Sequence, residues 1–228
     1  MRNRRIPAIP SFPEKSEYGL IEPEIKYLTM DQQQEVLNSI PEDERSIFLF
    51  LKYHYRRPSE ACALQWRDFD EINKAFIIRR TFSARKLVDS TKTNAVHHVP
   101  CHDDFYPVLM NLKKKHVGSS SDFVFQNPRA RKERKNWSDK TISETWKRAC
   151  TKAGIKGVSL YQGTKHTACM HFVNQLGSMD ELQVLTDHKR RDSVKHYAAV
   201  GLERKRELMM KNKKVVNLND YKTTTKDY

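Results

Sequence analysis

The chain has 228 residues, a formal net charge of +14 and a pI near 9.6, which predict one large domain with tails and favour a nucleic-acid partner over an acidic small-molecule binder. The longest apolar stretches, such as Ile47–Leu51, fall far short of the roughly 20 residues that cross a bilayer, and the basic start Met1–Arg5 leads into prolines rather than an apolar signal core. We therefore expect a cytoplasmic, nucleoid-associated protein without a membrane partner.

The first third of the chain predicts an arm followed by three helices. Residues 1–27 hold four of the nine prolines and no sustained periodicity, which predicts an extended linker or arm. A capping-box pattern at Thr29 and Gln32 then predicts a helix of about ten residues. Pro41 and the three acids after it open a second helix, because acids in the first turn suit the helix dipole. Pro58 suits the first turn of a third, short helix.

The hydrophobic period changes in the next segment. Ala75–Ile78 and Val96–Val99 are β-type runs, joined by a polar stretch rich in Ser, Thr and Lys. We expect a small antiparallel sheet with a long mobile hairpin. Phe123–Phe125 is expected as one more short strand.

Helical patterns return after the sheet. Asp103–Lys115 has acids first and bases last, as the helix dipole prefers. The later part of the chain, to about residue 210, is expected to be helical with breaks near residues 154–157, at Gly177 and near residues 188–191. The fold class is therefore α+β, mainly α-helical with a small antiparallel β-sheet.

Positive charge is concentrated between residues 111 and 152, where the chain has twelve Lys or Arg and four Asp or Glu. Because Lys and Arg that contact phosphates release condensed counterions, we expect a DNA-binding loop beside Trp137 and a helix whose inward face holds Ile142 and Trp146. A merely solvated charged face is the alternative. The candidate DNA-binding residues are Arg129, Arg131, Lys132, Arg134, Lys135, Lys140 and Lys147.

A motif lies between Tyr55 and Asp70, which read Y-R-R-P-S-E-A-C-A-L-Q-W-R-D-F-D. It resembles the first signature of the tyrosine recombinase (phage integrase) family, a pattern of the form G-[LM]-R-x-x-E-[AL]-x-x-L-x-W-x-D-[IF]-D. Arg57 takes the place of the invariant arginine and Glu60 the place of the acid, whereas the glycine before them is missing. An amphipathic helix that happens to end in W-x-D is the alternative.

A second motif lies near the end of the chain. The sequence L-T-D-H ends at His188, and Tyr197 follows nine residues later. It resembles the closing pattern of the same family, L-[LG]-G-H-x(8)-Y, in which the tyrosine is the nucleophile. Asp187 stands where glycine is usual. A purely structural role for Tyr197 is the alternative.

Thr91–Pro100 is similar to the β-hairpin of the family, and Lys92 then matches the lysine that reaches the scissile position. Possible metal ligands lie at its end: His97, His98, Cys101 and His102. Because successive side chains of a strand alternate between its faces, these four would be divided two and two, which breaks up a four-ligand site. The four cysteines have no C-x-x-C pair and are expected as free thiols. We therefore expect no metal.

Tyr161–His171 aligns with the helix H-x-x-R-H-T-x-A-[TS]-x-[LH] of the family, with changes at two of the six active-site positions. Gln162 stands for the first histidine and Lys165 for the second arginine. The resemblance covers roughly residues 28–200, and its four motifs occur in the order of the family. The active-site residues that it implies are Arg57, Lys92, Gln162, Lys165, His188 and Tyr197.

The resemblance also implies a chemistry. Tyr197 would attack a phosphodiester to form a 3′-phosphotyrosine, while Lys92 protonates the 5′-hydroxyl leaving group. Arg57 would clamp the nonbridging oxygens, and Lys165 would add a second charge as a point rather than a fork. His188 would bind the phosphate or accept the proton of the tyrosine. Because the covalent link keeps the energy of the phosphodiester, neither ATP nor a metal is expected.

The resemblance further implies the tyrosine recombinase catalytic-domain fold over residues 28–200, double-stranded DNA as the partner and a tetramer on DNA. Family members normally have an additional N-terminal helical domain that completes a clamp, and residues 1–27 are too short for one, so we expect an isolated domain or a partner-dependent protein. Residues 201–228 are expected as a basic segment that is exchanged between subunits or disordered. The alternatives are a non-catalytic DNA-binding protein on the same fold and an unrelated basic helical RNA-binding protein.

Overall fold

The computed structural model describes residues 26–91, 94–130, 135–175, 177–188, 191–195, 197, 206 and 209–210. The arm expected at residues 1–27 and the C-terminal segment expected at residues 201–228 therefore lie almost wholly outside the described residues. None of the described helices is long and apolar enough to span a membrane.

The three predicted N-terminal helices are present as α1 (Met30–Asn38), α2 (Glu42–His54) and α3 (Pro58–Cys62). The hydroxyl group of Thr29 accepts a hydrogen bond from the backbone of Gln32 at 3.2 Å, and the Gln32 side chain accepts one from the backbone of Thr29 at 3.0 Å. The capping box predicted from these two residues is confirmed.

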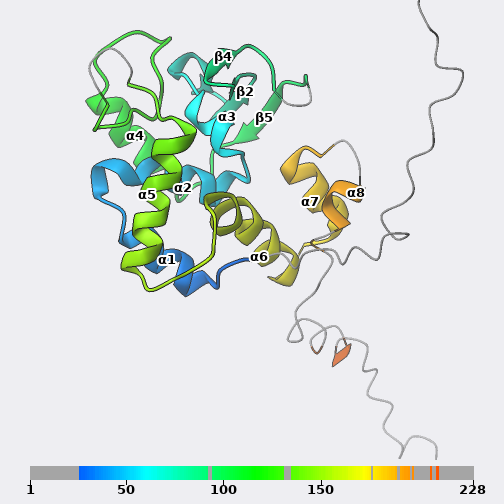
Figure 1. Ribbon diagram of the computed structural model, residues 1–228. Helices are drawn as coiled ribbons and strands as arrows, with labels where there is room; N and C mark the ends of the chain where they lie inside the picture. Colours follow the sequence, from blue (N-terminus) through cyan, green and yellow to red (C-terminus); the bar gives the residue numbers. More distant parts are fainter. Residues whose placement is uncertain are drawn as a thin grey trace, which may run out of the picture.

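A three-stranded antiparallel sheet follows, with the strand order β1-β2-β5 (Figure 1). Its elements are the 3₁₀ turn η2 (Trp66–Asp68) and the strands β1 (Phe69–Asp70), β2 (Ala75–Ile78) and β5 (His97–Pro100). Phe76 of β2 pairs with Val99 of β5, and both side chains are buried. The predicted pair of strands is confirmed.

The connection between β2 and β5 differs from the prediction of one long mobile hairpin. It contains two further strands, β3 (Thr81–Ser83) and β4 (Lys86–Val88), which form a second, two-stranded antiparallel sheet. Phe82 of β3 packs against Phe123, with 5.8 Å between the ring centroids. This contact anchors the hairpin to a loop that lies about forty residues further along the chain.

The helix predicted after the sheet is present with its bases in the last turn, but its start differs from the prediction, and so does one predicted strand. Helix α4 (Tyr106–Lys115) begins three residues after Asp103, because Pro107 occupies its first turn, where the missing amide hydrogen is least costly. The strand expected around Phe123 is reduced to an isolated bridge between Phe123 and Gln65. Neighbouring strands that would extend this bridge into a ladder are absent from the described residues.

The described residues between 139 and 195 are mainly helical, as predicted, and the breaks between the helices fall near the expected positions. They contain α5 (Asp139–Lys152), the π-helical segment η3 (Gln162–His166), α6 (Thr167–Gln175), α7 (Met179–Thr186) and α8 (Asp192–Lys195). Gly154 and Gly157 both have a φ of +73°, in the region that favours glycine, and they end α5 and turn the chain back. Ile142 and Trp146 form the inward face of α5, as predicted.

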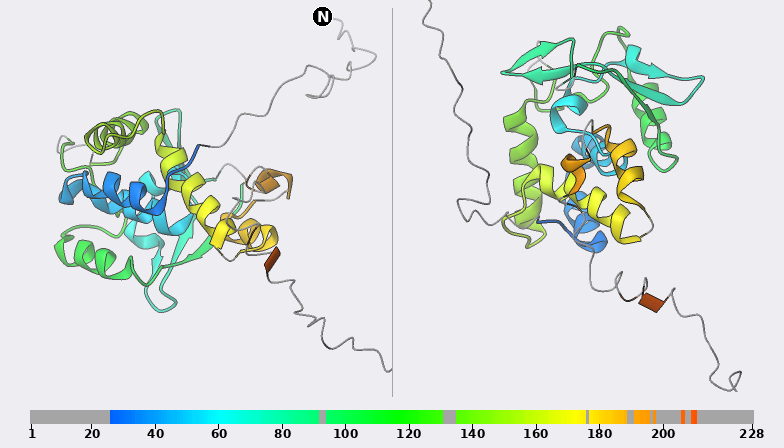
Figure 2. Two further views of the ribbon diagram at one scale, coloured as in Figure 1. Left: turned by 90° about the horizontal axis from the view of Figure 1, so that it is seen from below. Right: turned by 90° about the vertical axis from the view of Figure 1, so that its right-hand side faces the viewer.

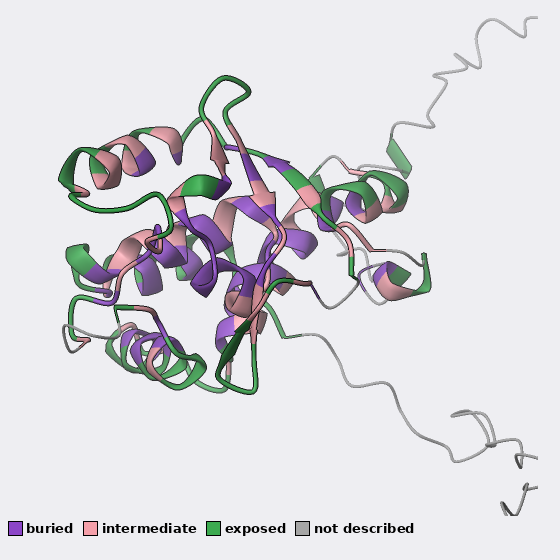
Figure 3. Ribbon diagram, turned by 90° about the horizontal axis from the view of Figure 1, so that it is seen from above, coloured by how far each residue is buried: buried purple, intermediate pink, exposed green. Residues whose placement is uncertain are grey.

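Buried apolar side chains form two clusters. The larger cluster joins α1, α2, α4 and α5 to the sheet, and it includes Phe48, Trp137 and Trp146. The smaller cluster lies among α6, α7 and α8 and consists of Cys169, Met170, Val173, Leu182, Val194 and Tyr197. Figure 1 and Figure 2 show α7 and α8 to one side of the body, beyond α6. In Figure 3, buried residues gather in the interior, and the outward faces of the peripheral helices are exposed.

One close approach fixes η3 against α5. The backbone carbonyl of Gly163 accepts a hydrogen bond from Gln33 at 2.8 Å. A Cβ atom on Gly163 would lie only 2.1 Å from the indole ring of Trp146, a separation that no real contact allows. Trp146 is itself fixed, because its ring stacks on Phe48 and its Nε1 donates to the carbonyl of Val158. The chain therefore needs glycine at this position.

Candidate active site

Arg57 lies in the turn between α2 and α3. Tyr55, which ends α2, has a left-handed backbone with a φ of +56°, so the tyrosine that replaces the family glycine occupies a conformation in which glycine is least strained. The Arg57 guanidinium forms an ion pair with Glu60 at 2.9 Å and is one quarter exposed. Burial opposes its charge, but Glu60 and the hydroxyl group of Tyr161 outweigh this effect and raise the pKa of Arg57.

Lys165, in η3, is only 1% exposed, which is unusual for a side chain that ends in an ammonium group. Burial, and next the positive charge of Arg57, lower the pKa of Lys165 to about 8. Cys169 and Glu60 act in the opposite direction. Within the part of the chain that the structure describes, no carboxylate forms an ion pair with Lys165.

Tyr197 is also buried, with 1% of its surface exposed. Its ring meets the ring of His166 edge to face at 5.5 Å, and its hydroxyl group is hydrogen-bonded to Cys169. Burial and the neighbouring Cys169 raise the pKa of Tyr197, while Arg57 lowers it. Since Lys165 also interacts with Arg57 and Cys169, the structure brings Arg57, Lys165 and Tyr197 together.

The side chains of Gln162 and His188 each form a hydrogen bond with a residue nearby in the sequence. The Gln162 side-chain oxygen accepts a hydrogen bond from the backbone of Ser159 at 2.9 Å, so Gln162 caps the turn that begins η3. The imidazole Nδ1 of His188 lies 2.5 Å from the hydroxyl group of Thr186. This contact orients the ring in the turn that follows α7.

Asp187, which precedes His188, ends α7 in a left-handed conformation with a φ of +54°. Aspartate tolerates this conformation better than most residues, which accounts for its presence where the family has glycine. Its carboxylate forms an ion pair with Arg56 at 2.5 Å, and Nδ1 of His97 lies 3.4 Å from the same carboxylate. Sequence reasoning missed Arg56, although an arginine where the pattern has Leu or Met was a signal for it.

Only some of the site residues predicted in the hairpin are among the described residues. Lys92 lies outside the described residues. Before it in the sequence, the hydroxyl group of Thr91 donates to the carbonyl of Ala95 at 2.8 Å. Beyond β5, His102 stacks on Tyr53 and its backbone nitrogen donates to Nε2 of His54. Burial lowers the pKa of His54 to about 3, so this histidine is neutral.

Among the described residues, no three or more His, Cys, Asp or Glu side chains come together in a group that could hold a metal ion. The possible ligands at the end of the hairpin point to different neighbours, since His97 faces Asp187 and His102 faces Tyr53. All four cysteines have free, buried thiols.

The predicted DNA-binding surface is divided by the structure. Arg131, Lys132 and Arg134 lie outside the described residues, whereas Lys135, Lys140 and Lys147 are exposed. Arg129 forms an ion pair with the buried Glu44 of α2, which ties the basic loop to the core. Trp137 is also part of the core, because it is 2% exposed and meets Phe48 edge to face. Trp137, beside which the DNA-binding loop is expected, therefore belongs to the core and is not available for DNA contact.

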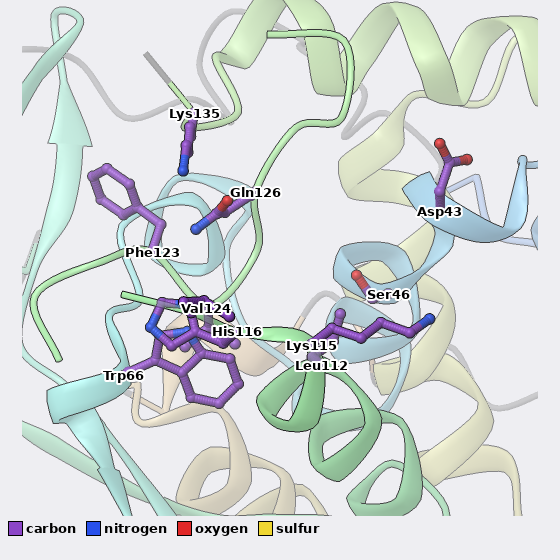
Figure 4. A pocket seen from close by; sticks show the side chains of 11 residues that line it. Asp43, Ser46, Trp66, Leu112, Lys115, His116, Phe123, Val124, Gln126 and Lys135 are labelled. Atoms are coloured by element: carbon purple, nitrogen blue, oxygen red, sulfur yellow. The ribbon is translucent and has the colours of Figure 1, made fainter. Parts of the chain in front are cut away.

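A separate cavity of about 260 Å³ opens between α2, α4 and the loop that follows α4 (Figure 4). Basic and aromatic side chains line part of it, including Trp66, Lys115, His116 and Lys135. It contains none of the residues that interact with Arg57, so it is distinct from the candidate active site.

Comparison with known proteins shows which family the chain belongs to. The model of the phage integrase family matches residues 26–204. A curated relative from Escherichia coli (strain K12), "Putative defective protein IntQ", is 29% identical over 178 residues, which cover 64% of this chain and 44% of that protein. The chain thus spans less than half the length of this relative.

Solved structures share the architecture. XerA recombinase matches with a TM-score of 0.65 and 17% identity over 83% of this chain and 66% of that one. The Tn1549 transposon integrase, in complex with a circular intermediate DNA, matches with a TM-score of 0.66 and 19% identity over 84% of this chain and 67% of that one. The fold is therefore that of a tyrosine recombinase catalytic domain, and the chain belongs to the phage integrase family.

Proposed function

We propose that this protein is a site-specific DNA recombinase that breaks and rejoins double-stranded DNA through a 3′-phosphotyrosine intermediate. The observation that carries the proposal is that the Arg57 guanidinium acts electrostatically on both the Lys165 ammonium and the Tyr197 hydroxyl group, so the three groups lie close together. Attack on a phosphodiester needs cations for the nonbridging oxygens and a nucleophile held beside them. The three side chains supply these groups.

The electrostatics of the two cations favour an anionic ligand. The charge on Arg57 and the burial of Lys165 both disfavour the protonated form of Lys165. A phosphodiester between the two side chains would raise the pKa of Lys165, because a nearby opposite charge favours the charged form. Binding of DNA would therefore relieve a repulsion that the free protein contains.

In the proposed reaction, the oxygen of Tyr197 forms a bond to phosphorus as the bond to the 5′ oxygen breaks. His188 accepts the proton of the tyrosine, and Lys92 protonates the 5′ oxygen. Rejoining reverses each step. Because the hydroxyl group of Tyr197 is buried against Cys169, the side chain has to leave this position before it reaches a phosphate.

The two changed active-site residues, Lys165 and Gln162, have defined roles in this proposal. Lys165 supplies the charge of the usual arginine from a single ammonium group, which makes one aimed contact instead of a bidentate one. Gln162 donates a hydrogen bond to the phosphate from its amide nitrogen while its oxygen caps η3. The site keeps its positive charge and loses one acid–base group.

Double-stranded DNA is the proposed partner, with a tetramer as the working assembly. The XerH recombinase bound to its difH substrate and the DNA complexes of the Tn1549 integrase support a DNA partner for this fold. The exposed side chains of Lys135, Lys140 and Lys147, together with the charged run at residues 131–134, would follow the phosphate backbone.

A covalent trapping experiment tests this function. The full chain is incubated with a pool of short nicked duplexes of randomised sequence, and DNA that remains attached after denaturation is recovered and sequenced. We expect adducts with the wild type in the presence of EDTA and none with Tyr197→Phe. The matched control is Tyr106→Phe, a tyrosine of α4 outside the site, which should leave adduct formation unchanged. Adducts that persist with Tyr197→Phe, or that require a metal, would contradict the proposal.

A non-catalytic DNA-binding protein on the same fold is the second candidate. Two observations favour it: the use of the Gln162 oxygen as a helix cap, and a curated relative named as a putative defective protein. It predicts retention of duplexes by the chain without any covalent adduct. The same experiment therefore separates the two candidates, because binding and adduct formation are measured on one pool.

A further inference from the structure

Two departures from the family pattern contact each other. Arg56 stands where the first signature has Leu or Met, and Asp187 stands where the closing pattern has Gly. The two residues are 131 positions apart, and their side chains form an ion pair with 2.5 Å between Nη1 and Oδ2. Each residue directly precedes a residue of the candidate active site, Arg57 or His188.

Arg56 is bound on three sides. Its side chain is 3% exposed, and its Nε donates to the backbone carbonyl of His54 at 2.7 Å. Its Nη2 donates to the carbonyl of Leu185, and its Nη1 donates to Asp187. A single guanidinium thus joins the end of α2 to the end of α7.

A third segment meets the same carboxylate. The imidazole Nδ1 of His97, at the start of β5, lies 3.4 Å from Oδ2 of Asp187. The hairpin that contains Lys92 ends at this strand. Asp187 therefore contacts side chains from two other motif segments, which lie 90 and 131 positions before it in the sequence.

We propose that Arg56 and Asp187 are a pair of positioning residues that hold the His188 turn against the Arg57 turn. The catalytic consequence rests on the proposed function, whereas the positional one does not. Neither residue needs to touch the substrate, because the pair acts through its neighbours. A site assembled from separate segments requires such a connection, since small displacements of a reacting group cost large factors in rate.

The burial of the pair predicts an asymmetry that a simple surface ion pair would lack. Removing one partner of a buried pair leaves an uncompensated charge, whereas replacing both partners with apolar groups is often tolerated. Arg56 is 3% exposed and Asp187 is 29% exposed. Loss of the carboxylate should therefore disturb the turn that contains His188 more than loss of the guanidinium. Without Asp187, the buried Arg56 would keep its charge with neither its carboxylate partner nor water around it.

The experiment uses the full chain and the variants Asp187→Asn, Arg56→Leu and Arg56→Leu/Asp187→Gly. Asparagine keeps the size of aspartate and tolerates its left-handed backbone, so only the charge is lost. We expect Asp187→Asn to increase amide hydrogen exchange at residues 185–188 by about tenfold or more and to shift the NMR titration of His188. Asp180→Asn is the matched control, because Asp180 lies on the same helix in an exposed pair with Arg191.

The double variant supplies the decisive comparison. We expect Arg56→Leu/Asp187→Gly to restore slow exchange at residues 185–188 and single-turnover cleavage to within about threefold of wild type, whereas Asp187→Asn lowers cleavage by about 10–100-fold with DNA affinity unchanged. Unchanged exchange and an unchanged His188 titration in Asp187→Asn would overturn the proposal. A double variant worse than both single variants would also overturn it. Absence of covalent adducts with the wild type would reject the proposed function alone, because exchange and titration do not depend on activity.

Discussion

The two apolar clusters of this molecule differ in size and in which residues of the candidate active site they contain. The larger cluster joins four helices to the sheet and contains the two fully buried tryptophans, Trp137 and Trp146. The smaller cluster has six described buried residues from α6, α7, α8 and the turn after α8, and one of them is Tyr197. The proposed nucleophile thus lies in the part of the structure with the smaller apolar core, whereas Arg57 follows directly from α2 in the larger one.

This difference has a consequence for local stability. The free energy of local opening follows the number of buried apolar contacts, so segments with few contacts open more often than the core does. The smaller cluster should therefore open without unfolding of the larger one. The Tyr197 hydroxyl group, which is buried against Cys169, could then reach a substrate at a modest cost in free energy.

The largest expected effect comes from the larger cluster. Trp146→Ala removes a buried indole that stacks on Phe48 and donates to the carbonyl of Val158. We expect a loss of about 3–5 kcal/mol in the free energy of unfolding, with all helices melting together. Urea unfolding followed by circular dichroism measures this loss. A decrease below about 1 kcal/mol would show that the division into two clusters does not reflect where the stability lies.

The second prediction concerns the buried charge of Lys165. Because the pKa of Lys165 is about 8 in the folded state and 10.5 in the usual reference, the unfolded chain binds more protons between these values, and stability rises with pH across that window. Lys165→Met should therefore raise the free energy of unfolding at pH 7 by roughly 1–3 kcal/mol and abolish cleavage.

The gain from Lys165→Met should decline as the pH rises from about 8 toward 10.5, since the wild-type lysine is then neutral in the folded state. Lys140→Met is the matched control, because Lys140 is 82% exposed. A gain that is independent of pH would show that the stabilisation comes from packing of the methionine instead of removal of the charge.

The third prediction addresses the smaller cluster. Val194→Ala removes two buried methyl groups from α8, which should cost about 1–2 kcal/mol. We expect this loss to appear mainly as faster amide hydrogen exchange in α6, α7 and α8, with exchange in α2 and α5 unchanged. Uniformly faster exchange throughout the molecule would mean that the two clusters open as one cooperative unit.

The smallest expected effect compares two equally buried thiols. Cys62 in the larger cluster is 1% exposed and Cys169 in the smaller cluster is 0% exposed. In a variant with Cys101→Ser and Cys150→Ser, we expect a thiol reagent to modify Cys169 at least about tenfold faster than Cys62, which corresponds to ~1.4 kcal/mol in opening free energy. Equal rates of modification would contradict the difference between the clusters.

Much of the local structure could be predicted from the sequence, because its signals are short-ranged. The capping box at Thr29 and Gln32 and the β-type run in β2 depend on residues within a few positions of one another, and both predictions are confirmed. The motifs around Arg57 and Tyr197 were found in the same way. Their spacing, not the identity of any single residue, carried the information.

The missed features depend on contacts between distant segments. The pairing of Arg129 with Glu44 connects a predicted DNA-binding residue to the core. The ion pair between Arg56 and Asp187 joins residues 131 positions apart. A pattern of residue types along the chain does not show which buried charged side chains form ion pairs with each other. For the same reason, it does not show the packing of Phe82 against Phe123, which anchors β3 and β4.

The glycine at position 163 has a consequence for how related sequences are interpreted. A side chain there would collide with the Trp146 ring, so the position is closed to substitution for as long as a tryptophan occupies the facing position on α5. An unvarying glycine beside Lys165 would then record the fit between two helices and not contact with a substrate. In a collection of relatives, the two positions should change together, with a smaller residue at 146 wherever a larger one stands at 163.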